Sequence, residues 1–238
     1  MRILGIDSSG LVATVAVIDE KEMVAEYTVN YKKTHSQTLL PMIDEIVKMI
    51  ELDLDTIDAI AISAGPGSFT GLRIGSATAK GLGLALNKPL ISVPTVDGLA
   101  FNLYSTEKII CPIMDARRSQ VYTGIYTFIE NQFTILEPQM AVSIQEIAKK
   151  LNTLEKEVIF LGDGVPVYKE ILATLMTTPY TFAPVHMSRQ RAGAVAALGL
   201  QYMETGDIQT ATEHQPEYLR LSQAEREQIE KEAKRNDN

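Results

Sequence analysis

Short apolar runs alternate with segments of helical periodicity through the first 104 residues. Strand patterns occupy residues 2–7, 14–18, 24–31, 59–64 and 89–93, and Ser8-Ser9-Gly10 forms a turn between the first two. Helical patterns run from about residue 38 to 51, from the glycine-rich run to about residue 87, and over 95–104. This alternation predicts an α/β layer structure.

The second half repeats the order of the first. Residues 109–115 form an apolar strand that ends in an acid, as residues 2–7 do, and residues 120–129 return after a tight turn. The pattern then predicts strands at 133–136 and 158–161 and helices at 143–151, 167–175 and 191–205. This repeat predicts two duplicated α/β lobes with a cleft between them.

Polarity marks the expected domain limits. The polar residues 105–108 are the expected boundary between an N-terminal lobe over 1–104, which carries the partner-binding helices, and a C-terminal lobe over 105–221. Residues 222–238 carry charges without a helical apolar stripe. We expect that tail to be solvated and disordered.

Composition narrows the class of protein. The net charge of -8 and a pI of about 5.0 argue against a chain that binds nucleic acid by itself, so an RNA function would need a partner's surface. The single cysteine, Cys111, lies in an apolar stretch, and the first residues run directly into a strand pattern. No apolar run approaches the roughly 20 residues that span a bilayer. We therefore expect a soluble, cytoplasmic protein.

The glycine-rich run over residues 65–75 joins a buried strand to a helix. Gly65 and Gly67 allow backbone angles that other residues avoid, and Ser68 or Thr70 can cap the helix. A helix start after such a bend is a common anion site. The run matches neither a Walker loop nor a spaced G-x-G-x-x-G fingerprint, so phosphate binding is left open.

The two helices of the first half carry more apolar or small surface than one sheet requires. The apolar residues over 39–50 cover roughly half of the helix circumference. Gly71, Gly75, Ala79 and Gly83 recur every four residues and form a ridge of small residues. Two interpretations are open: the ridge receives a partner helix, or it lets the helix lie flat on its own sheet.

The sequence contains few candidate catalytic, metal-ligating or phosphate-binding residues. Asp7, Ser8 and Ser9 place a carboxylate and two hydroxyls in one turn, which fits either a nucleotide-phosphate site or an ordinary structural turn. Asp115, followed by Arg117 and Arg118, has the same ambiguity. The three histidines are far apart in sequence and have no cysteine companion, so we expect no metal site and no catalytic residues.

Several motifs resemble one family. They are residues 3–9, 35–36 with 39–41, 65–75, 93–95 with 99–100, 115–117 with 121–122, and 216 with 218–220. Together they resemble the TsaB (YeaZ) family of bacterial tRNA threonylcarbamoyladenosine biosynthesis proteins, over about residues 1–220. The run Gly-Pro-Gly-Ser-Phe-Thr-Gly-Leu-Arg at 65–73 is highly specific for that family.

The resemblance implies a fold and a function. The fold is that of the actin, sugar kinase and Hsp70 superfamily (ASKHA, RNase H-like), with two duplicated α/β lobes. The implied function is that of a scaffold subunit that forms a heterodimer with the paralogue TsaD and works with the ATPase TsaE. Those proteins place threonylcarbamoyl on the adenosine at position 37, next to the anticodon, of tRNAs that read ANN codons. The resemblance implies that tRNA is reached only through the complex.

The resemblance also implies site residues. Two histidines, four residues apart, hold the metal of the catalytic paralogue, and Thr95 and Leu99 stand at those positions here. The chain is therefore expected to have no cofactor of its own, with ATP or ADP only at the complex interface. The family pairs through first-lobe helices. The expected interface residues are Leu39, Ile43, Val47, Ile50, Phe69, Thr70, Gly71, Leu72, Arg73, Gly75 and Ala79.

Two other functions compete with this interpretation. An independent ATP-dependent small-molecule kinase of the same fold would need an adenosine pocket, for which Gly162-Asp163-Gly164 is the candidate. A self-associating protein would close a homodimer with the same apolar helix face. Size-exclusion chromatography with and without the paralogue separates the homodimer from the heterodimer.

Overall fold

A mixed sheet is the base of the first lobe. In the computed structural model, which describes residues 1–31 and 34–220, its strand order is β3-β2-β1-β4-β5. The strands are β1 (Arg2–Asp7), β2 (Ala13–Asp19), β3 (Met23–Val29), β4 (Ala59–Gly65) and β5 (Leu90–Pro94). Because β1 pairs antiparallel with β2 and parallel with β4, the predicted hairpin is confirmed. Every residue of β4 is buried, as expected for a strand covered on both faces.

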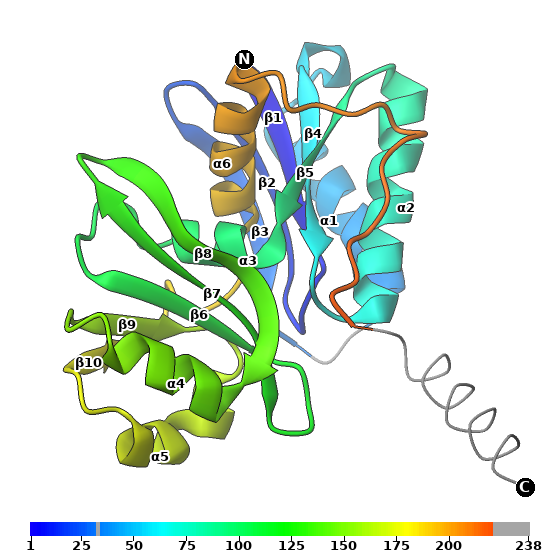
Figure 1. Cartoon of the computed structure of the whole chain (residues 1–238). Helices are drawn as coiled ribbons and strands as arrows, with labels where there is room; N and C mark the ends of the chain where they lie inside the picture. The colour runs from blue at the N-terminus through cyan, green and yellow to red at the C-terminus, as the bar shows by residue number, and fades with distance from the viewer. Residues whose placement is uncertain (32–33, 221–238) are drawn as a thin grey trace, which may run out of the picture.

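Helices cover both faces of this sheet (Figure 1). On one face lie α1 (His35–Met49) and α2 (Phe69–Leu86), and a short 3-10 helix, Leu54–Thr56, follows α1. On the other face lie α3 (Thr95–Phe101) and α6 (Ala192–Glu204). The predicted cap of α2 is confirmed, because Ser68 Oγ accepts a hydrogen bond from Gly71 N at 3.3 Å.

The second lobe repeats the strand arrangement of the first. Its described strands have the order β8-β7-β6-β9-β10, and β6 again pairs antiparallel with the next strand and parallel with β9. The elements are β6 (Ile109–Asp115), β7 (Gln120–Ile129), β8 (Gln132–Ser143), α4 (Ile144–Asn152), β9 (Val158–Leu161), α5 (Val165–Leu175) and β10 (Tyr180–Phe182). The duplication inferred from the sequence is therefore confirmed.

Helix α6 lies on the first sheet although its residues fall within the predicted second lobe (Figure 1). A Cβ added at Gly5 would overlap the carbonyl oxygen of Ala192, and one added at Gly199 would lie 2.7 Å from Ala61 Cβ. Small residues on both sides thus allow close approach of α6 to β1 and β4. The predicted C-terminal lobe of residues 105–221 therefore includes a helix, α6, that packs on the sheet of the first lobe.

Some element limits also differ from the prediction. Helix α3 ends at Phe101 instead of residue 104, and β8 extends from Gln132 to Ser143. The predicted cap at Ser143 is present, with Glu146 N donating to Ser143 Oγ at 3.1 Å. No helix within residues 1–31 and 34–220 is both long and apolar enough to cross a membrane. The predicted disorder of residues 222–238 falls outside the described residues.

Candidate functional site

The turn that follows β1 is closed by its own hydrogen bonds. Asp7 Oδ1 accepts from Ser9 N at 2.8 Å and from Ser9 Oγ at 2.7 Å, and Asp7 Oδ2 accepts from Ser63 Oγ at 2.5 Å. Ser8 Oγ donates to Gly71 O at 2.9 Å. Burial raises the pKa of Asp7, whereas the hydrogen bonds from Ser63 and Ser9 act to lower that pKa. Asp7 is thus tied to both β4 and its own turn.

The glycine-rich loop packs directly on this turn. Ser68 N donates to Ser9 O at 2.7 Å. A Cβ added at Gly67 would overlap Ser9 O, and one added at Gly71 would overlap Ser8 O. Glycine is required here by the close approach of two backbones. Asp7, Ser8 and Ser9 are each only 1% exposed, so the predicted phosphate-binding residues present no open surface. The geometry supports the alternative interpretation, a structural turn.

The small-residue ridge of α2 faces the protein's own sheet. Gly71, Gly75 and Ala79 are buried, and a Cβ added at Gly75 would overlap Ser8 Oγ and lie 3.1 Å from Ile62 Cδ1. Leu72 is buried as well. Their prediction as partner-interface residues is wrong, because the lack of side chains serves helix-to-sheet contact. The second interpretation of the ridge is the correct one.

Much of the predicted apolar face of α1 is also internal. Leu39 and Ile43 are buried in the core between α1 and the sheet, so their assignment to a partner interface is wrong. Val47 and Ile50 are half-buried and pack on the rim of the same core. Among the predicted interface residues, the half-buried Val47, Ile50 and Phe69 and the exposed Thr70 and Arg73 therefore reach the surface.

A different line of residues forms the outer surface of the two helices. On α2 the exposed residues Thr70, Arg73, Ala77, Gly81 and Leu84 follow each other at spacings of three or four. A Cβ added at Gly81 would meet no atom within 4 Å. On the adjoining α1, Leu40 is 55% exposed and Met49 is 73% exposed, and Leu84 on α2 is 63% exposed. Leu40 and Met49 are nine residues, or about two and a half helical turns, apart, so they flank the buried stripe of α1 on its two sides. We call these seven exposed residues of α1 and α2 the outer helix face.

The sequence contains a signal for this outer helix face that the prediction missed. Small residues occur on two lines of α2, one through Gly75 and one through Ala77 and Gly81. Had the first line been assigned to the sheet, the second would have followed on the opposite side of the helix. Leu40 is one of the apolar residues over 39–50, and the sequence pattern alone does not separate those that face the sheet from those that face away from it.

Other positions that were considered for a metal, a nucleotide or a nucleophile are also part of the packed interior. Thr95 Oγ1 accepts from Gly65 N at 3.1 Å, and Leu99 is buried in the core, so the two residues that the resemblance places at metal-ligand positions help to hold the loop and the core. In the turn considered as an adenosine pocket, a Cβ added at Gly162 would overlap Ile113 O. Cys111 is buried, and burial raises its pKa to about 12, which is unfavourable for a nucleophile.

The described residues contain no cluster of three His, Cys, Asp or Glu side chains placed to hold a metal ion. The outer helix face places three large, exposed apolar side chains, Leu40, Met49 and Leu84, on the two predicted partner helices.

The chain is similar in sequence to proteins of a tRNA-modification pathway. Residues 22–228 match the family model described as TsaD: tRNA N6-adenosine threonylcarbamoyltransferase. The tRNA threonylcarbamoyladenosine biosynthesis protein TsaB of Bacillus subtilis (strain 168) is 31% identical over 230 residues. That alignment covers 97% of this chain and 99% of the relative.

Solved structures show the same fold. YeaZ from Pseudomonas aeruginosa superimposes with a TM-score of 0.77 at 24% identity, covering 92% of this chain and 100% of that chain. Component A of the (R)-2-hydroxyglutaryl-CoA dehydratase of Acidaminococcus fermentans gives a TM-score of 0.50 at 11% identity, covering 87% and 99%. At these identities the likeness concerns the fold alone, which is the duplicated α/β fold of the ASKHA type. The near full-length match to TsaB, carried on that fold, shows that the chain belongs to the TsaB (YeaZ) family.

Proposed function

We propose that this chain is a non-catalytic subunit of the machinery that makes threonylcarbamoyladenosine in tRNA. It pairs with a TsaD-type threonylcarbamoyltransferase and works with a TsaE-type ATPase on the adenosine next to the anticodon of tRNAs that read ANN codons. The name of its relative supports the pathway, and the match to the TsaD model supports a partner of the same fold. Any ATP or ADP is held where the subunits meet.

The observation that carries this proposal is the outer helix face. Leu40, Met49 and Leu84 are large apolar side chains that remain mostly in water, and burying each fully is worth about 1.5–3 kcal/mol. Association itself costs roughly 4–15 kcal/mol, so these three contacts need support from close packing. The small residues Ala77 and Gly81 provide it, because they let a partner helix approach α2 closely.

The same helices exist in a paralogue of the same fold. Two such helix pairs packed face to face make a four-helix bundle, which buries both outer faces at once. The filled turns at Asp7 and Gly162 fit a subunit that supports the partner's chemistry. We expect the isolated chain to transfer no threonylcarbamoyl group to tRNA and the pair with TsaD and TsaE to do so.

The first test places a charge in the outer helix face. Leu84→Glu should weaken binding to the TsaD-type partner at least about 10-fold, equivalent to about 1.4 kcal/mol, because an unpaired carboxylate would be buried. Isothermal titration calorimetry measures the affinity. Val167→Glu is the matched control, since Val167 is also an exposed apolar residue, 55% exposed on α5 of the other lobe.

Equal affinities of the Leu84→Glu and Val167→Glu proteins would show that the outer helix face is not the pairing surface. Size-exclusion chromatography of the unsubstituted chain alone tests the competing homodimer. A dimer that Leu84→Glu converts to a monomer, with no binding to the TsaD-type protein, would favour self-association instead.

A further inference from the structure

Three motifs that lie far apart in the sequence meet at one place in the structure. The end of the glycine-rich run contributes Phe69 and Arg73, and the C-terminal segment contributes Tyr218, whose ring stacks on Phe69 with centroids 4.6 Å apart. Arg73 Nε donates to Tyr218 Oη at 3.3 Å. Figure 1 shows this segment, in orange, running along α2 to the beginning of that helix.

The third motif is the turn between β6 and β7. Arg220 Nη1 donates to the carbonyl oxygen of Ala116 at 2.5 Å, so the C-terminal segment joins the start of α2 to this turn. Arg117 and Arg118 follow in the turn and are exposed. The result is a surface that carries four guanidinium groups from three distant parts of the chain, at residues 73, 117, 118 and 220. We call it the arginine surface.

The arginine surface is unusual in a chain of net charge -8. Among the described residues, the ion pairs involve other cations, such as Lys108 with Glu157 and Arg191 with Glu26. The acids beside the surface, Asp115, Asp163 and Glu217, form no ion pair with it among the described residues. Asp115 accepts from Arg117 N and from Tyr168 Oη, Asp163 accepts from Asp115 N, and Glu217 accepts from Gln139 Nε2. The four guanidinium groups are therefore not held in ion pairs and can reach an anion.

The turn between β6 and β7 has the geometry of a tight hairpin. Gln120 N donates to Arg117 O at 3.2 Å, and the two central residues, Arg118 and Ser119, have positive φ angles of 55° and 58°. Positive φ at both central positions is what a two-residue hairpin turn requires, so the hairpin fixes the backbone that carries Arg117 and Arg118.

The chemistry of the arginine surface fits a phosphodiester backbone. A guanidinium group offers planar paired donors that match phosphate oxygens, and Tyr218, 39% exposed and stacked on Phe69, offers a ring on which an unpaired base can stack. We propose that the arginine surface contacts the phosphodiester backbone of the tRNA substrate. This inference rests on the proposed function for the identity of the RNA.

The test compares two double variants that lose the same charge. Arg117→Ala with Arg118→Ala removes two cations from the arginine surface, and Lys21→Ala with Lys156→Ala removes two exposed cations elsewhere. Fluorescence anisotropy of the full chain with an unmodified tRNA transcript, from about 50 to 200 mM salt, measures affinity and its salt dependence. We expect the arginine variant to bind about 5- to 20-fold more weakly at the lowest salt, with a salt slope reduced by about 1–2. The lysine variant should stay within about 2-fold of the unsubstituted chain.

Several results would overturn the proposal. These are no measurable tRNA binding by the unsubstituted chain at about 50 mM salt, equal losses in the two double variants, or binding of heparin without binding of tRNA. Calorimetry with the TsaD-type partner is run on the same variants. Unchanged pairing of the Leu84→Glu protein would contradict the proposed function, whereas unchanged tRNA affinity of the arginine variant would contradict the arginine surface, so the two failures are distinguishable.

Discussion

At the scale of single residues, glycines on one helix have opposite environments. In α2, Gly71 faces Ser8, and a Cβ there would overlap the Ser8 carbonyl oxygen. Gly81 lies on the outer helix face, where an added Cβ would meet no atom within 4 Å. Gly71 lies in the first turn of the helix and Gly81 in its interior, where replacing glycine by alanine gains at most about 1 kcal/mol. A loss of stability at Gly71 therefore reports the contact with the turn.

This comparison gives a prediction for folding stability. Gly81→Ala should raise the free energy of unfolding by about 0.5–1 kcal/mol, because alanine favours the helix. Gly71→Ala should lower it by about 1–3 kcal/mol despite that gain, because the loop must move away from the turn. Urea unfolding followed by circular dichroism measures both. If both variants gain stability equally, Gly71 is not in close contact with Ser8.

Single residues also show where sequence patterns succeed and fail. The caps at Ser68 and Ser143 could be predicted because a cap is a local hydrogen bond within a few residues. The direction of the small-residue ridge is harder to predict, since both sides of α2 carry small residues and the outer line is marked by one charged residue, Arg73. The sequence also allows two interpretations of Asp7, a phosphate site and a structural turn. The positions of Ser63 and Gly71 in space distinguish them.

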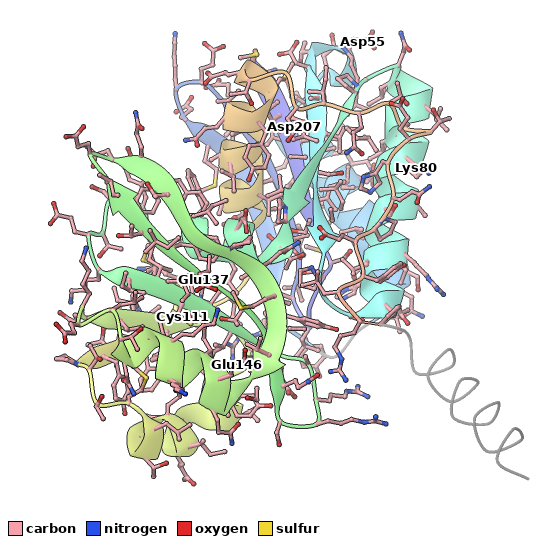
Figure 2. The ribbon with its side chains drawn as sticks, viewed as in Figure 1. Asp55, Lys80, Cys111, Glu137, Glu146 and Asp207 are labelled. Carbon is pink, nitrogen blue, oxygen red and sulfur yellow. The ribbon has the colours of Figure 1, made fainter. Side chains whose placement is uncertain are left out.

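At the scale of elements, the C-terminal segment acts as an extra strip along β5 and α2. Gln209 and Leu90 exchange two backbone hydrogen bonds of 2.8 Å. Further along, His214 Nδ1 and Ser92 Oγ lie 2.8 Å apart, and Lys80 Nζ donates to the His214 carbonyl oxygen at 3.0 Å. Figure 2 labels Lys80 on α2 beside this segment. His214 is fully buried and is the main side-chain anchor of the strip.

His214 makes the attachment of the strip dependent on pH. Burial, and then the charge of Lys80, lowers the pKa of His214 below its ordinary value of 6.5. A lowered histidine pKa means that the contribution is complete above pH 6.5 and is lost as the pH falls below that value. At pH 7, His214→Ala should cost about 1–3 kcal/mol in the free energy of unfolding. The difference from the unsubstituted protein should shrink toward pH 5.

Urea unfolding at several pH values measures this effect. His186→Ala is the control, since His186 is exposed, and it should change the stability by less than about 0.5 kcal/mol at each pH. A His214→Ala penalty that does not vary between pH 7 and pH 5 would contradict the prediction.

At the scale of the whole molecule, a buried carboxylate joins the two lobes. Asp97 on α3 accepts from Tyr126 Oη of β7 at 2.7 Å and from Tyr202 Oη of α6 at 3.4 Å. Burial raises the pKa of Asp97 from 3.8 to about 6; the hydroxyl groups of Tyr126 and Tyr202 act to lower it, and the charge of Glu217 acts to raise it. Burial and the Asp97 charge also raise the pKa values of both tyrosines, which keeps them as donors.

The raised pKa of Asp97 has a defined consequence for stability. Because the protonated carboxyl is favoured in the folded state, its contribution is complete below pH 3.8 and is lost as the pH rises to about 6. The difference between those two pKa values corresponds to about 3 kcal/mol. Asp97→Asn should therefore have the same stability as the unsubstituted protein near pH 4 and a higher stability at pH 7.

The Asp97 prediction is checked by urea unfolding from pH 4 to 7, with Asp55→Asn as a control for loss of an exposed carboxylate (Figure 2). The contribution of Asp97 to stability falls as the pH rises, whereas that of His214 increases. The two effects are separated by comparing the stability of each variant with that of the unsubstituted protein at the same pH. A constant difference across this pH range would show that Asp97 ionises as readily in the folded chain as in the unfolded one.

The overall architecture could be predicted in part. The repeated order of strand, acid, turn and strand was visible in the sequence, and it gave the duplicated sheets because hairpins and short crossovers are local. The position of α6 was not predictable in the same way, since chain order does not say to which sheet a late helix returns. Only the matching small residues, such as Gly5 and Gly199, reveal its place once they are seen together.

The contact between the glycine-rich loop and the Asp7 turn limits how this chain can be redesigned. It is made by main-chain atoms, with Ser68 N on Ser9 O and glycines where any side chain would intrude. Point mutations change side chains and leave main-chain atoms in place. Substitutions can therefore break this contact but cannot open it into an ordered pocket. An engineer who wanted an open pocket here would have to lengthen the loop before choosing its residues.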